Sequence, residues 1–166
     1  DGSQTQTESF RVASDQNIYV ANNNGIVVGH TAQITFGTPE GGYAPEFQVL
    51  GNSIQDEYIG IGGWSTNAVR GPALTFLRSK NAAIGSFTVL ATGDHLGEIN
   101  WSGDDGTDYQ SVGAAVRVEV DATPGTGSMP SRILIATSAD GSEVPTTRIT
   151  IASTGLTTFA AGSTPA

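Results

Sequence analysis

The stretch Ala114-Ala-Val-Arg-Val-Glu-Val120 decides the fold class of this 166-residue chain. Three valines alternate in it with Arg117 and Glu119. Because successive side chains of a β-strand point to opposite faces, this period of two places the valines on one face and the charges on the other. The stretch therefore predicts a strand with one apolar face and one charged face.

The same alternation recurs along the chain, and clusters of turn-forming residues separate the alternating runs. Helix-type spacing of apolar residues is nearly absent. Short strands divided by Asn-Gly, Asp-Gly and Gly-rich turns are typical of all-β proteins. The sequence thus predicts an all-β fold of short antiparallel strands in stacked sheets. The alternating runs are Ala32, Ile34 and Phe36; Leu96 to Trp101; Ile133 and Ile135; and Ile149 and Ile151, and the turns include Gly41-Gly42, Asp104-Asp-Gly106, Pro124-Gly-Thr-Gly127 and Ala139-Asp-Gly141.

The composition excludes several functional classes. The 16 acidic residues outnumber the 7 basic ones, which gives a net charge of −9. Such a field repels phosphate, and no basic stripe is present, so a nucleic-acid partner is not expected. The chain has no cysteine, which excludes disulfides, thiolate metal sites and a cysteine nucleophile. No apolar run approaches the roughly 18 residues of a membrane helix, so no membrane partner is expected.

The surface chemistry indicates a protein that works outside the cytoplasm. Charged residues make up 14% of the chain, against roughly 25% in an average soluble domain. Threonine, serine, glycine and amide side chains replace them. Neither a basic start nor an apolar core marks a signal peptide, and the chain begins without methionine, which indicates a processed or excerpted fragment. We expect an extracellular or particle-surface location.

An internal repeat links the two ends of the chain. Asp1-Gly-Ser3 recurs as Asp140-Gly-Ser142, and at the same offset Val12 meets Ile151. A shared turn followed by a shared alternation predicts the same local structure for residues 1–14 and 140–153. We interpret the repeat as the ends of two successive modules in a longer array. The alternative is a turn and strand that the biased composition favours twice.

A longer succession of motifs in the second half, covering residues 72–156, resembles modules of bacteriophage tail fibres and related virion appendages. These modules often lie just upstream of a C-terminal self-cleaving chaperone domain, an intramolecular chaperone that is absent here. The motifs are Pro72-Ala-Leu-Thr-Phe-Leu-Arg-Ser79, Gly93-Asp-His-Leu-Gly-Glu-Ile-Asn-Trp101, Gly103-Asp-Asp-Gly-Thr107, Ala114-Ala-Val-Arg-Val-Glu119, Met129-Pro-Ser-Arg132, Asp140-Gly-Ser142 and Pro145-Thr-Thr-Arg-Ile149.

The resemblance implies a homotrimeric fibre module on the virion, whose partners are copies of itself, other tail proteins and a host polysaccharide or receptor. The composition is compatible with this, because a chain of low apolar content gains stability when copies bury apolar surface against one another. Trimerisation would also cover sheet edges. The number three follows from the resemblance alone.

The resemblance and the composition together divide the chain into four parts. Residues 1–36 are expected to end a preceding β module, and residues 37–71 to form a Gly-rich connection or small subdomain. Residues 72–159 are the main module, and residues 160–166 are a linker.

The acidic and histidine residues favour a structural interpretation over catalysis. Asp104, Asp105 and Asp108 lack the terminal bidentate glutamate of an EF-hand loop and are interpreted as a turn in which Asp caps its own backbone. Asp94-His95 has no Gly-x-Ser-x-Gly elbow to serve. Glu98, Glu119 and the aspartates could supply a glycosidase pair, but scattered acids always offer pairs. We expect no enzymatic activity, no metal site and no cofactor.

Exposed aromatic residues in Gly-rich segments are the candidates for binding a glycan or receptor. An aromatic ring on such a segment can stack on a sugar, whereas aromatic residues otherwise serve cores. We select Tyr43, Trp64 and Tyr109, and we expect Trp101 to belong to the core because it lies inside an alternating strand.

The sequence favours one function and leaves two others open. The first is a structural and adhesive segment of a virion fibre that spaces or presents a host-binding tip. The second is a repeat unit of a bacterial surface filament or adhesin. The third is a segment of a glycan-degrading tailspike.

Overall fold

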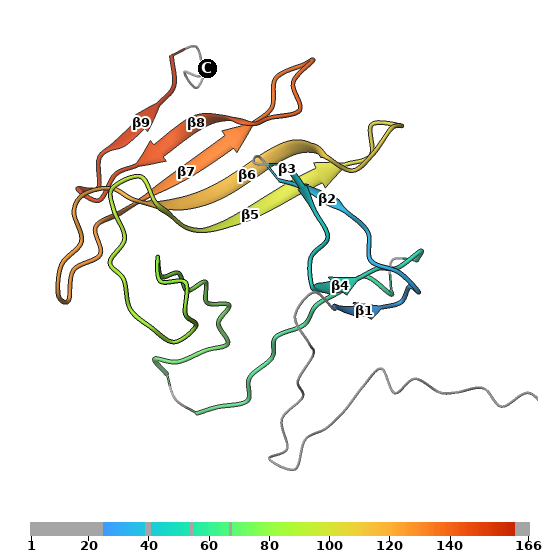
Figure 1. The fold of residues 1–166 in the computed structure, drawn as a ribbon, viewed down its shortest axis with the longest axis horizontal. Coiled ribbons are helices and arrows are strands. Elements are labelled where there is room, and N and C mark those ends of the chain that lie inside the picture. The colour runs from blue at the N-terminus through green and yellow to red at the C-terminus, as the bar shows by residue number, and fades with distance from the viewer. Residues whose placement is uncertain (1–24, 39–40, 54, 67, 162–166) are drawn as a thin grey trace, which may run out of the picture. The chain divides into compact units, whose positions relative to one another are not determined.

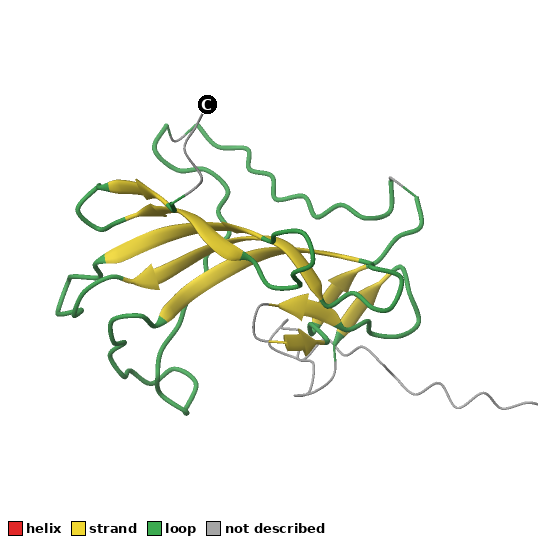
Figure 2. Cartoon of the chain, turned by 90° about the horizontal axis from the view of Figure 1, so that it is seen from above, coloured by secondary structure: helices red, strands yellow, loops and turns green. Residues whose placement is uncertain are grey.

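The computed structural model describes residues 25–38, 41–53, 55–66 and 68–161, and these form nine strands and no helix (Figure 2). This confirms the all-β fold. No helix in the described ranges could span a membrane. The strands are β1 (Ile26–Val28), β2 (Phe36–Thr38), β3 (Gly41–Tyr43), β4 (Phe47–Val49), β5 (His95–Gly103), β6 (Ser111–Val120), β7 (Ser131–Thr137), β8 (Thr146–Ile151) and β9 (Thr157–Phe159).

The chain divides into two compact units, and the smaller one contains β1 and β4. These two strands pair in parallel, with Ile26 opposite Phe47, so they are the exception to the expected antiparallel pairing. The amide side chain of Gln48 is buried beside them. It accepts a hydrogen bond from the backbone N–H of Ile34 and donates one to the Ile34 carbonyl, both at 2.9 Å. A side chain thus substitutes for a neighbouring strand.

This arrangement explains why the alternation of Ala32, Ile34 and Phe36 does not produce the expected strand. Both backbone groups of Ile34 are bound by Gln48, and only Phe36 belongs to a strand, at the start of β2. The prediction of a strand over this run is wrong. The predicted turn at Gly41-Gly42 is also wrong, because both glycines lie within β3 and pair with Thr38 and Gly37 of β2.

The larger unit contains the β2–β3 hairpin and a five-stranded antiparallel sheet in which β5, β6, β7, β8 and β9 follow one another in chain order (Figure 1). The predicted turns connect these strands. Residues 104–106 lie between β5 and β6, residues 124–127 lie between β6 and β7, and residues 139–141 lie between β7 and β8. Gly106, Gly127 and Gly141 adopt φ values of 89°, 71° and 74°, which glycine tolerates best.

The register divides the side chains of the sheet between two faces. Val116 pairs with Ile135, which pairs with Ile149, which pairs with Phe159. Directly paired residues point to the same side. We call this side the apolar face, which is formed by Ile99, Trp101, Ala114, Val116, Val118, Ile133, Ile135, Ile149, Ile151 and Phe159.

The opposite side of the sheet carries the charges, as the alternation predicts. Glu98 pairs with Arg117, and Glu119 pairs with Arg132. We call this side the ionic face, which is formed by Glu98, Asn100, Ala115, Arg117, Glu119, Arg132, Leu134 and Ala136.

Burial within the sheet does not simply follow the chemistry of its two faces. On the ionic face Ala115, Ala136 and even Glu119 are buried. On the apolar face Ile99, Trp101, Ile133 and Phe159 are all exposed by 39% or more. Val120, in line with Val116 and Val118, is fully buried, so the single chain covers one end of the apolar face and leaves the part around Ile99, Trp101, Ile133 and Phe159 facing solvent.

The sheet from β5 to β9 lies within residues 72–159, the expected main module, and the four-part division of the chain stays a prediction. The expected equivalence of residues 1–14 with 140–153 involves Val12, which lies outside the described residues. Its second copy is a turn followed by β8, with Ile151 half-buried on the apolar face.

Candidate functional site

Two of the three predicted binding residues, Tyr43 and Tyr109, lie in neighbouring parts of the backbone. Tyr43 ends β3 and pairs with Phe36 of the hairpin. The N–H of Gly37, in the same hairpin, donates a 2.8 Å hydrogen bond to the carbonyl of Tyr109. Tyr43 is 60% exposed and Tyr109 is 45% exposed. The hairpin and the loop before β6 thus present two tyrosines to solvent from adjoining backbone.

The loop that carries Tyr109 is fixed by its aspartates. Asp105 Oδ1 accepts hydrogen bonds from the N–H of Thr107 and of Asp108, and its Oδ2 accepts one from the Ser111 hydroxyl. Asp104 Oδ1 accepts a 2.7 Å bond from the N–H of Gly106. The interpretation of this cluster as a self-capping turn is confirmed. Its carboxylates orient the backbone that leads to Tyr109.

Trp64, the third predicted residue, lies in a separate loop. Its side chain is 96% exposed, and its ring lies 3.3 Å from where a Cβ on Gly62 would be. A neighbouring cavity of about 350 Å³ is lined by Ile61, Ser65, Arg70 and Pro72 among others. An indole this exposed has most of its surface available to a ligand.

Trp101 differs from the expectation of a core residue. It lies on the apolar face of β5, opposite Ala114, and is 54% exposed. Its position inside an alternating strand is as predicted. Its burial is not as predicted, because this part of the apolar face is not covered in the single chain.

The ionic face holds a chain of ion pairs that the sequence analysis did not identify. Arg117 contacts Glu98 at 2.5 Å and Glu119 at 3.8 Å. Arg132 contacts Glu119 at 2.7 Å, and the pKa of Arg132 is raised, first by its hydrogen bond to this carboxylate. His95 Nε2 lies 3.5 Å from Glu119 as well. Glu119 is thus the centre of the network, although only 7% of it is exposed.

The two glutamates among the acids considered for a glycosidase pair belong to this network. Glu98 and Glu119 are each held by an arginine, and they lie on different strands. Their observed partners give these carboxylates a structural role. Within the described ranges no three His, Asp or Glu side chains are grouped so as to hold a metal ion.

Asp121 extends the ionic network to the turn between β8 and β9. Its Oδ2 accepts hydrogen bonds from the N–H and the hydroxyl of Ser153, at 2.8 and 2.7 Å, and its Oδ1 lies 3.5 Å from Arg132. The backbone bond from Ser153, then its hydroxyl, and the charge of Arg132 hold the pKa of Asp121 below its ordinary value of 3.8.

This shift predicts part of the acid sensitivity of the fold. A carboxyl whose pKa is lower in the folded chain stabilises it above the unfolded value and loses that effect as the pH falls through the folded value. Asp94 and Asp105 are shifted in the same direction, by the N–H groups of Ala91 and Thr107 respectively. We expect the melting temperature to fall steadily below pH 3.8, and Asp121→Asn to make that fall shallower. A variant with the same acid slope as the parent would contradict this assignment.

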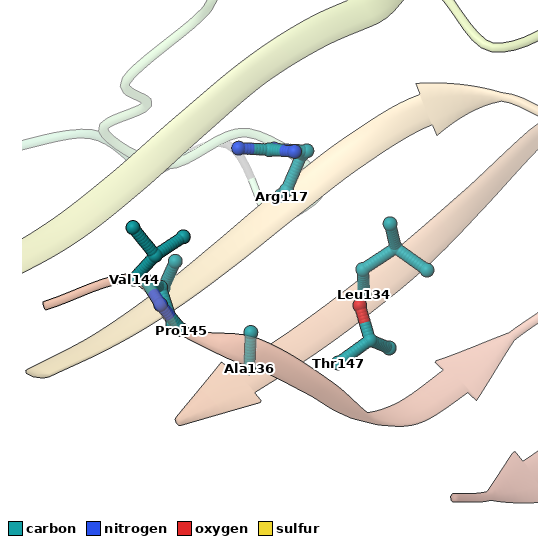
Figure 3. Close-up of a pocket in the computed structure, with 7 residues that line it drawn as sticks. Arg117, Leu134, Ala136, Val144, Pro145 and Thr147 are labelled. Carbon is teal, nitrogen blue, oxygen red and sulfur yellow. The ribbon is translucent and has the colours of Figure 1, made fainter. Parts of the chain in front are cut away.

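A small cavity on the ionic face lies under the segment that precedes β8 (Figure 3). It has a volume of about 230 Å³ and is lined by Arg117, Leu134, Val144 and Pro145 among others. Ligand pockets usually measure roughly 300–1,000 Å³. The Arg117 side chain is also engaged by Glu98, so this cavity is a poor ligand site.

On the apolar face, the segment before β5 covers one corner of the sheet. A Cβ added to Gly97 would lie 2.7 Å from the Cβ of Phe76, so the Phe76 side chain packs directly on β5. The Nη1 of Arg78 donates to the carbonyl of His95 at 2.6 Å. Between this segment and the sheet lies an apolar groove of about 370 Å³, with Leu74, Ile99 and Val116 in its walls. The face is open around Trp101, Ile133 and Phe159, which are exposed.

No protein-family model matches this chain, and no curated protein matches it significantly. Its fold alone therefore defines its class: an all-β protein built on a five-stranded antiparallel meander whose apolar face is only partly covered.

Proposed function

We propose that this chain is a structural and adhesive segment of a bacteriophage tail fibre, which assembles as a homotrimer and spaces or presents a host-binding tip. One observation carries the proposal: four large apolar side chains of the apolar face are exposed while a glutamate on the other face is buried. Contiguous exposed apolar surface on a soluble protein marks an interaction site. This surface supports the proposal that the chain is part of an assembly.

The sequence motifs supply the kind of assembly. Residues 72–156 resemble fibre modules, and the all-β fold without helices agrees with that class of protein. The low content of charged residues, 14%, suits a surface solvated by hydroxyl and amide groups outside the cell. Tyr43, Tyr109 and Trp64 are the exposed aromatic residues that we assign to glycan or receptor contact.

Two measurements test the proposal. Sedimentation equilibrium of the 166-residue chain should give three times the 17.0 kDa of one chain. Gold-labelled antibodies against it should then decorate the fibres of phage particles in electron micrographs. A folded monomer at micromolar concentration would refute the trimer, and labelling of the bacterial envelope instead would favour a surface filament or adhesin.

A further inference from the structure

The two faces of the sheet differ in the ion pairs that they carry. On the ionic face, the carboxylates of Glu98, Glu119 and Asp121 are matched by the guanidinium groups of Arg117 and Arg132. The apolar face has no acidic side chain at the paired strand positions that the structure describes, and at its edge Arg148, beside the irregularity in β8, donates a hydrogen bond to the Thr137 hydroxyl. Only the second face can be desolvated without breaking ion pairs.

We infer that the apolar face is the surface through which copies of this chain pack against one another. The inference rests on the proposed homotrimer and assigns its interface. The charge of the chain indicates which partner packs against this face. Each copy carries a net charge of −9, so copies repel one another over most of their surface. Contact through a face without carboxylates brings no acidic groups of two copies together.

A charged partner is a poor occupant of the same surface. A basic or acidic protein would find no counter-charge among Ile99, Ile133 and Phe159, and its own charges would be desolvated without compensation. The same face of a second copy presents isoleucine, valine and aromatic side chains, which lose water on contact at a gain of roughly 25 cal/mol per Å². Self-association thus matches the chemistry on both sides.

The size of the face is consistent with this role. Five strands about 4.8 Å apart, with roughly five paired residues each at about 3.3 Å per residue, cover about 400 Å² of sheet plane. A stable interface buries about 800 Å² per partner. Residues 68–94, which are described throughout and contain no strand, offer additional apolar surface, because Leu77, Ile84 and Phe87 are almost fully exposed there.

The last strand of the sheet provides a matched pair of test positions. Phe159 and Thr158 are adjacent in β9 and both exposed, but by register Phe159 lies on the apolar face and Thr158 on the opposite one. Sedimentation equilibrium would compare the full chain with Phe159→Glu and Thr158→Glu. We expect Phe159→Glu to weaken association at least 100-fold and Thr158→Glu to leave the trimer intact. A parent trimer that survives both substitutions equally would overturn the interface while leaving the proposed function standing, whereas a monomeric parent would refute the proposed homotrimer.

Thiol labelling provides a second readout that does not depend on an introduced charge. The chain has no cysteine, so Ile133→Cys and Thr158→Cys each create the sole thiol. In the trimer, we expect the thiol at position 133 to react with iodoacetamide at least tenfold more slowly than the thiol at position 158. Equal rates in the trimer would overturn the inference. Slow labelling of the thiol at position 133 in separated monomers would overturn it as well, because residues of the same chain would then cover this position.

Discussion

Replacing Glu119 with alanine is expected to lower the free energy of unfolding by about 2–3 kcal/mol, one of the largest effects of any single substitution in this chain. Glu119 is 7% exposed, and its carboxylate is the common partner of Arg117, Arg132 and His95. Removing a buried ion's partner leaves the opposite charge uncompensated, which costs about 3–5 kcal/mol when both groups are fully buried. We expect less because both arginines keep some exposure and a second acidic partner.

Glu143→Ala provides the matched control. Glu143 is also an acidic residue of the larger unit, but it lies exposed in the segment before β8. Its removal should change stability by no more than about 0.5 kcal/mol, as is usual for surface substitutions. Chemical denaturation with guanidinium chloride measures both variants. Equal midpoints for Glu119→Ala and Glu143→Ala would show that the ionic face adds nothing to the fold.

The ionic network illustrates how far the sequence predicts the fold. The alternation around Arg117 and Glu119 correctly places both residues on the face opposite the valines. With the Asp-Gly and Gly-rich turns located, neighbouring strands must run antiparallel, so oppositely charged residues on them can meet. Which pairs form depends on register. Two irregularities between β5 and β6 shift that register by amounts the turns do not reveal.

The burial of Trp101 and the strand expected near Ile34 show what alternation cannot predict. Periodicity states which residues share a face, but it does not state whether anything covers that face. Trp101 therefore has the predicted position and an unpredicted exposure. At Ile34 the competing factor is a distant side chain: Gln48 binds the backbone groups that a neighbouring strand would otherwise bind. Neither effect leaves a local signal in the sequence.

The candidate binding residues were selected by composition, and the structure adds the contact that relates two of them. The backbone N–H of Gly37 holds the hairpin that carries Tyr43 to the loop of Tyr109. No sequence pattern indicates this contact. The Ser102 hydroxyl also donates a 2.8 Å bond to the Gly37 carbonyl. Gly37 is thus bound on both sides of its peptide.

Gly37→Ala is accordingly expected to release the β2–β3 hairpin and to destabilise the chain by about 2–3 kcal/mol, at the upper end of overpacking costs. The Cβ of the new alanine would lie 2.4 Å from the carbonyl oxygen and 2.5 Å from the Cα of Gln110. Both are backbone atoms, so no side-chain rotation relieves the clash, and the strands must separate.

Gly103→Ala serves as the control for this substitution, because a Cβ at Gly103 in β5 meets nothing within 4 Å. It should leave stability unchanged or raise it slightly, since alanine restricts the unfolded chain more than glycine does. Amide hydrogen exchange provides the local readout. In Gly37→Ala the amide at position 37 should lose its protection, because its bond to the Tyr109 carbonyl breaks, while the amides of β7 in the sheet centre keep theirs. If protection at position 37 persists and the two variants melt together, the hairpin and the loop do not approach each other this closely. Tyr43 and Tyr109 would then have no common support and could not form one binding surface.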